Sequence, residues 1–146
     1  MNAVEFWGTF HTFFLWGLEA WVVPPIQIIG LLSLGSLAVC ILRPSNIRTH
    51  WRASYWFVFT QLLFYPLIIA VGAAFQAHTA ARPFRPNPLG EYLLDALTVT
   101  SVLTACFWVW RMRELRWLAG SLVVLQEAIL FGAMFIAGMS VTGDWL

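Results

Sequence analysis

The run from Leu118 to Met139 reads LAGSLVVLQEAILFGAMFIAGM, and it decides the fold class. It is long enough to cross a bilayer, because a spanning helix needs about 20 mostly apolar residues. Trp117 is expected at the membrane surface, since Trp prefers the level of the lipid headgroups. Glu127 is the one ionisable residue of the run and lies roughly 15 Å deeper, at 1.5 Å per residue. The sequence therefore predicts a carboxyl group near the centre of the membrane.

The composition of the whole chain agrees with a membrane protein. Of 146 residues, 60% are hydrophobic and 10% are charged, against about 25% charged in ordinary soluble domains. We therefore expect residues 1–146 to form a single transmembrane domain. The net charge of +1 and the short basic loops exclude a nucleic-acid partner. All basic residues are Arg, a composition that favours a prokaryotic source and hence a multi-pass protein of the cell inner (plasma) membrane.

Three further apolar runs complete a predicted all-α fold with four transmembrane helices. The predicted spans are about 22–42, 54–76, 92–110 and 118–139. Pro66 lies near the centre of the second span, where a kink is expected. The connector at 77–91 contains three prolines, which predicts a stiff non-helical segment.

Residues 3–20 precede the first span and carry an amphipathic helix pattern. One side is polar apart from one Trp and holds Glu5, Thr9, Thr12, Trp16 and Glu19. The other side holds Phe6, Phe10, Phe13, Phe14 and Gly17. This pattern predicts an interfacial helix lying in the membrane surface. A fifth span is the alternative, and it is disfavoured because three ionisable side chains would enter the membrane.

The loops predict the orientation of the chain. The loops before the second and fourth spans carry three Arg each, the middle loop carries two and the termini carry none. The positive-inside rule then places both termini on the non-cytoplasmic side, N-out and C-out. The Trp residues form two belts at matching depths: Trp51, Trp56, Trp108, Trp110 and Trp117 inside, and Trp7, Trp16, Trp21 and Trp145 outside.

Glu127 is the main candidate site residue. A carboxyl group in the bilayer centre costs several kcal/mol unless it is neutral, paired or hydrated, so other segments are expected to pack around it. It is either a proton-accepting or ion-binding group or a neutral, hydrogen-bonded contact that holds helices together. Gln126 should point elsewhere, because adjacent residues on a helix do not share a face. The candidate partners are Tyr65, Ser33 and Ser36, and Gln61 is a further candidate residue of the intramembrane polar site.

Two further sets of polar residues are weaker candidates. Asp95 begins a line along one face of the third span that continues through Thr98, Ser101 and Thr104. With Glu127 this line could border a proton or ion path, although hydroxyl residues are also common in ordinary helix packing. On the outer face, His11, His78 and Asp144 could supply a metal site, but their spacing matches no metal motif. No motif implies a cofactor.

These features favour a non-catalytic structural or accessory subunit of a larger membrane complex, in energy conversion for example. The expected partners are the lipid bilayer and other membrane subunits or further copies of this chain. A homo-oligomeric channel or proton-coupled carrier that uses Glu127 is the alternative. An enzyme with an outer-face site is the third option, and it is disfavoured because no catalytic motif is present.

Overall fold

The structure, a computed structural model, describes residues 3–19, 24–42, 50, 52–80 and 87–143, and these are helical almost throughout. The fold is all-α, as the sequence predicts. The elements are α1 (Ala3–Glu19), α2 (Pro24–Leu42), the 3₁₀ helix η2 (Ala53–Leu63), α4 (Phe64–Ala80), α5 (Pro88–Arg111), the 3₁₀ turn η3 (Arg113–Leu115) and α6 (Arg116–Thr142).

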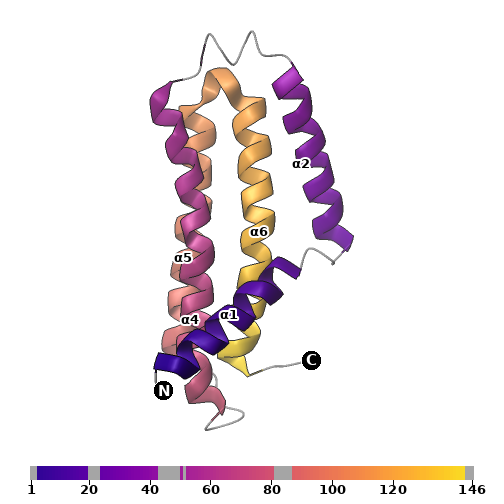
Figure 1. The fold of residues 1–146 in the computed structure, drawn as a ribbon. Coiled ribbons are helices and arrows are strands. Elements are labelled where there is room, and N and C mark those ends of the chain that lie inside the picture. Colours follow the sequence, from indigo (N-terminus) through magenta and orange to yellow (C-terminus); the bar gives the residue numbers. More distant parts are fainter. Residues whose placement is uncertain (1–2, 20–23, 43–49, 51, 81–86, 144–146) are drawn as a thin grey trace.

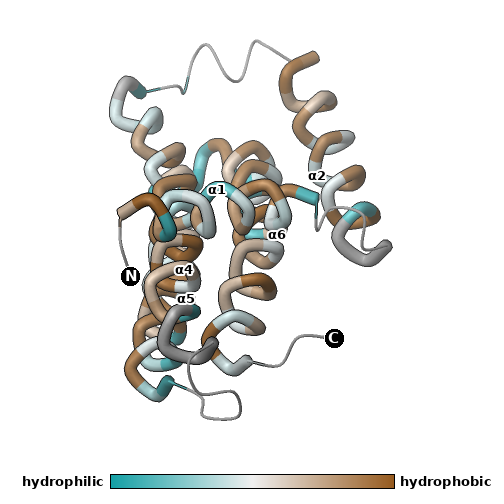
Figure 2. Tube along the Cα trace, turned by 60° about the horizontal axis from the view of Figure 1, so that its bottom comes forward, coloured by the Kyte–Doolittle hydropathy of each residue, from teal (hydrophilic) through white to brown (hydrophobic). Residues whose placement is uncertain are grey.

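Three helical stretches are long and apolar enough to cross a membrane. They are Ser54–Gln76, Pro88–Arg111 and Arg113–Thr142, and α2 contributes a shorter apolar stretch at Gln27–Leu42. Figure 2 shows apolar residues along all of these helices. By length and hydropathy the chain is therefore a multi-pass membrane protein, which confirms the predicted class.

Helix α6 is the centre of the bundle. It packs against α1, α2, α4 and α5, whereas α2 has its main contact with α6 alone (Figure 1). Most of the buried residues of the bundle belong to α6 or to the helices that face it. The expectation that other segments pack around the run at 118–139 is confirmed.

The backbones of α4 and α6 approach each other closely. A methyl group added at Gly72 would lie 2.8 Å from the Cα atom of Ala137, so the absence of a side chain allows the backbones to meet. Beside this contact, the hydroxyl of Ser140 donates a 2.9 Å hydrogen bond to the carbonyl of Gly72. Small residues thus set the spacing of these two helices.

Helix α1 lies obliquely across α4 and α6 near the end of the bundle where α6 finishes (Figure 1). Phe13 and Gly17 are buried, and a methyl group added at Gly17 would meet the hydroxyl of Tyr65 at 2.7 Å. That hydroxyl donates a 2.6 Å hydrogen bond to the carbonyl of Phe14. The phenylalanine-rich side of α1 faces the core, which confirms the predicted division of its faces.

The connector predicted at 77–91 is shorter than expected, which is a correction. Helix α4 continues to Ala80 and α5 begins at Pro88; residues 81–86 lie outside the described part. The side chain of Asn87 accepts hydrogen bonds from the backbone N–H groups of Leu89 and Gly90. An Asn cap followed by Pro in the first turn starts a helix, because Pro has no N–H that the turn would need.

The second span changes its helix type before Pro66. Residues Ala53–Leu63 form a 3₁₀ helix, and the α-helix begins at Phe64. Eleven residues are long for a 3₁₀ helix, which is usually limited to three or four. Pro removes one α-helical hydrogen bond and its ring crowds the preceding turn, which accounts for a change of geometry at this point.

Candidate intramembrane polar site

A layer of polar side chains separates two apolar clusters inside the bundle. One cluster contains Tyr65, Ile68 and Leu130, and the other contains Val58, Ala105 and Val123. Between them, each of the three long helical stretches contributes one polar residue, and these are Gln61, Ser101 and Glu127. The fold thus places an amide, a hydroxyl and a carboxyl group at the same height of the bundle.

Gln61 is the residue that joins the three helices. Its side chain is 0% exposed, and its amide nitrogen donates to the carboxylate of Glu127 at 2.6 Å and to the backbone carbonyl of Ser101 at 2.8 Å. The hydroxyl of Ser101 lies 3.5 Å from the second oxygen of Glu127 and 2.9 Å from the carbonyl of Thr98. The carboxyl group is thus bonded mainly through Gln61.

The structure separates the other candidate partners from Glu127. The hydroxyl of Tyr65 is engaged with α1, as described above. Ser36 instead accepts a 2.7 Å hydrogen bond from Ser121, which joins α2 to α6, and Ser33 is buried beside the same contact. Gln126 is 3% exposed, and its side-chain oxygen has no hydrogen-bond partner in the described part of the chain. Gln126 makes none of the hydrogen bonds described for Glu127, and its direction relative to them stays a prediction.

Asp95 does not join this polar layer. It is exposed, and it lies six residues before Ser101, roughly 9 Å away along α5. The hydroxyls of Thr98 and Thr104 donate to carbonyls of their own helix, four residues back. These hydrogen bonds satisfy the hydroxyl donors locally, which favours the packing interpretation for this line of residues.

Glu127 also borders a groove between α5 and α6. The groove has a volume of about 590 Å³ and an apolar wall that includes Val102, Cys106, Val109 and Val123. Arg113 and Arg116 line it as well, and Arg116 stands eleven residues, roughly 16 Å, before Glu127 on α6. The carboxyl group can therefore be reached from outside the bundle. The groove itself was not predicted, although the spacing of 102, 106, 109 and 113 on one helix face is a usable signal.

The outer-face candidates are only partly covered by the structure. His11 is exposed on α1. His78 lies on α4, but its side chain is outside the described part, as is Asp144. Among the residues described, no three His, Cys, Asp or Glu side chains are close enough to hold a metal ion. The proposed metal site stays a prediction.

The Trp residues differ in their surroundings. Trp110 and Trp117 are 72% and 82% exposed at the end of the bundle where α5 turns into α6. Trp108, which was assigned to the same belt, is buried in the apolar cluster with Tyr55 and Met112. Its place is therefore in the core, because its helix face is turned toward α6 and η2.

Comparisons with protein-family models, with curated proteins and with solved structures found no match. The fold and the polar layer define a helical multi-pass membrane protein with a carboxyl group held inside its bundle.

Proposed function

We propose that the chain is a non-catalytic subunit of a larger membrane complex. The observation that carries this proposal is a groove of about 600 Å³ between α2 and α6. Half of its lining is large, namely Leu32, Arg116, Trp117 and Val124, and the other half consists of the small or hydroxyl residues Ser33, Ser36, Gly120 and Ser121. In membranes such residues are enriched where helices approach one another closely. A transmembrane helix of another subunit fits a groove of this composition.

The position of α2 supports this proposal. Its main contact is with α6, and its outward side carries large apolar residues such as Leu31 and Leu32, which are 68% and 70% exposed. A methyl group added at Gly120 would meet no atom within 4 Å, so the α6 side of the groove is open. A partner helix would cover the outward face of α2 and bury these side chains.

The polar layer also supports a structural role for the chain. Gln61 links the carboxyl group of Glu127 to α5, and the hydroxyls of the third span are bonded within their own helix. Interhelical hydrogen bonds of this kind hold transmembrane helices together. Under this proposal Glu127 fixes the arrangement of the second span, α5 and α6, and α6 forms one wall of the groove that binds the partner.

Site-specific photo-crosslinking in native membranes tests the proposal. A photoreactive residue at Leu32, which lines the groove, should give one discrete product that contains a different polypeptide. The matched control is Val99, which is 58% exposed on α5 and lies away from the groove. Equal labelling at both positions, or no discrete product at Leu32, would contradict the proposal.

A filling variant gives a second test. Gly120→Leu should block the groove and reduce copurification of the partner. Gly138→Leu is the matched control, because a Cβ atom added there also meets no atom within 4 Å but lies outside the groove. Full copurification with the Gly120→Leu variant would contradict docking at this groove.

We further propose that the chain has four spans, with α2 as the first, and that α1 lies in the non-cytoplasmic surface of the membrane. The exposed Trp117 marks one boundary, and a hydrocarbon layer about 30 Å thick ends some 20 residues later, near Ala137. A methyl group added at Gly17 would lie 3.4 Å from Ala133, so α1 meets α6 roughly 6 Å inside the boundary near Ala137. Interfacial helices lie about 5–10 Å deep.

Topology reporters test this orientation. A reporter fused at the α5–α6 turn should respond as cytoplasmic, and fusions at either terminus as external, in a cell inner membrane. Figure 1 places the start of α1 and the end of α6 at the same end of the bundle, opposite that turn. Reporters that give opposite sides for the two termini would exclude the proposal.

A homo-oligomeric channel or proton-coupled carrier is the second candidate. The observation that favours it is the access to Glu127 from the groove between α5 and α6. Flux through the purified, reconstituted protein should then be abolished by Glu127→Gln, with helix content unchanged. Equal flux in the variant and the wild type would exclude this candidate.

A further inference from the structure

A second pocket, of about 240 Å³, lies at the end of the bundle where α5 turns into α6. It is lined by Arg52, Tyr55, Trp110, Arg111, Arg113 and Glu114. Three guanidinium groups and one carboxylate give the lining a formal charge of +2. This pocket is separate from the polar layer and from the groove between α2 and α6, and it shares Trp110 and Arg113 with the groove between α5 and α6.

The backbone around the pocket is well anchored. The N–H of Tyr55 donates to the carbonyl of Arg52 at 2.9 Å, which fixes the start of η2. In the opposite wall, Met112 donates to Trp108 and Leu115 donates to Met112, which closes the turn between α5 and α6. Met112 is fully buried. The arginines therefore project from two segments whose neighbouring residues are held in the core.

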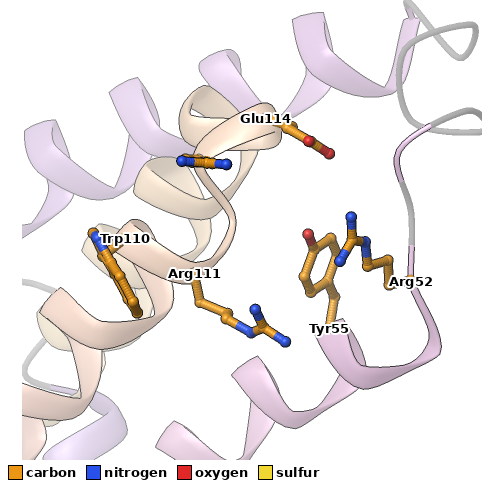
Figure 3. A pocket seen from close by; sticks show the side chains of 6 residues that line it. Arg52, Tyr55, Trp110, Arg111 and Glu114 are labelled. Carbon is orange, nitrogen blue, oxygen red and sulfur yellow. The ribbon is translucent and has the colours of Figure 1, made fainter.

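Figure 3 shows how the side chains are arranged. Arg52 and Arg111 reach toward Tyr55 from the two facing segments, and Glu114 stands at the turn. Like charges that share a small concave space repel one another, and an anion between them relieves that repulsion. Guanidinium groups also match phosphate oxygens with paired hydrogen bonds.

The level of the pocket indicates which anions it meets. Trp110 lines the pocket and is largely exposed, and Trp117 is exposed at the same end. Exposed Trp at the end of an apolar bundle marks the lipid headgroup level. Lipid phosphates occupy that level, and basic pockets between transmembrane helices bind anionic headgroups.

We propose that Arg52, Arg111 and Arg113 form a binding pocket for a phosphate group, supplied by the headgroup of an anionic membrane lipid. The guanidinium groups hold the phosphate oxygens, and Trp110 lies beside the glycerol part of the lipid. Glu114 weakens the site, because its carboxylate adds a repulsive charge at the rim. This site is independent of the subunit proposal, since neither groove contributes Arg52 or Arg111.

The test uses the purified full chain in a neutral detergent, titrated with phosphatidylglycerol and, as a reference, phosphatidylcholine. Native mass spectrometry counts the retained lipid, and the thermal unfolding temperature reports binding. We expect saturable retention of phosphatidylglycerol. Arg111→Gln should weaken it by about tenfold, because a hydrogen bond between charged groups is lost. Arg116→Gln is the matched control, an arginine at the same end of the bundle but outside this pocket.

Two further arms complete the test. Glu114→Gln should strengthen retention, since it removes the repulsive charge. Inorganic phosphate, compared with chloride at equal ionic strength, identifies the source of the ligand. If inorganic phosphate competes only weakly with phosphatidylglycerol, the ligand is a lipid headgroup. If inorganic phosphate binds tightly and saturably and displaces the lipid, the pocket binds free phosphate and the lipid source is contradicted. Equal weakening by Arg111→Gln and Arg116→Gln, or no weakening by Arg111→Gln, would overturn the proposal.

Discussion

Two buried glutamines of the bundle differ in their hydrogen bonds, and their replacement by leucine should have different consequences. Gln61 donates two interhelical hydrogen bonds, at 2.6 Å and 2.8 Å. Gln126 is also buried, but its side-chain oxygen lacks a partner among the described residues. Leucine has a similar size, so each substitution mainly removes the polar group and leaves the packing nearly unchanged.

The magnitude for Gln61→Leu follows from the two lost bonds. Interhelical hydrogen bonds in membranes are worth about 0.6 kcal/mol on average and up to about 1.7 kcal/mol. The carboxyl group of Glu127 would keep only its 3.5 Å contact with Ser101. The unpaired oxygen of Gln61 is removed at the same time, which offsets part of the loss. We expect a net loss of about 1–2 kcal/mol in the free energy of unfolding.

Gln126→Leu should leave the free energy of unfolding unchanged or raise it by up to about 1 kcal/mol, because a buried oxygen without a partner is costly. Both variants can be measured by titration with sodium dodecyl sulfate in mixed micelles, followed by circular dichroism. A loss for Gln126→Leu that equals or exceeds the loss for Gln61→Leu would refute the assignment of Gln61 as the residue that joins the three helices.

Substitutions at three further contacts of the bundle test the account. Gly72→Ala should lower the free energy of unfolding by about 1–3 kcal/mol through overpacking against α6. Gly138→Ala, with open space around it, should leave the free energy of unfolding unchanged or raise it by up to about 1 kcal/mol. Equal effects of the two substitutions in the same micelle titration would contradict the close packing of α4 and α6. Tyr65→Phe removes the hydrogen bond to α1 and should increase hydrogen exchange in residues 3–19 while leaving exchange in α5 unaffected. Unchanged hydrogen exchange in α1 would count against this contact. Asn87→Ala should cost about 1 kcal/mol and Asn87→Asp much less, because Asp also caps helices; similar melting curves for the two variants would exclude the cap.

The class of the fold could be predicted from the sequence because hydropathy and length suffice for it. The run at 118–139 is the longest apolar stretch with an internal carboxyl group, and it does form the helix that all others contact. The division of α1 into an apolar and a polar side could also be predicted, because the helical period separates its Phe residues from its polar ones. These features depend on local pattern alone.

The partner of Glu127 could not be selected by pattern. Gln61 and Tyr65 are four residues apart, so in a regular α-helix they would differ by only about 40° around the axis. The change from 3₁₀ to α geometry at Phe64 falls between them and widens that difference to about 80°. Gln61 therefore faces Glu127 while Tyr65 faces α1. Pro66 signals a disturbed helix in the sequence, but this local signal does not give the extent of the 3₁₀ segment from Ala53 to Leu63.

The early start of α5 was missed for a different reason. The prolines of the connector were interpreted as breaking the helix, although Pro88 directly follows Asn87, and Asn followed by Pro is a helix-start signal. The sequence therefore held the information. The groove between α2 and α6 could not be predicted, because it depends on how two helices far apart in the chain are placed side by side.

Native mass spectrometry of the protein, extracted gently from its own membrane, tests the central claim most directly. The subunit proposal predicts that the chain is released together with at least one different polypeptide at a fixed ratio, and that the ratio is lost in the Gly120→Leu variant. A chain that is released alone, or as a ring of identical copies, would contradict that proposal.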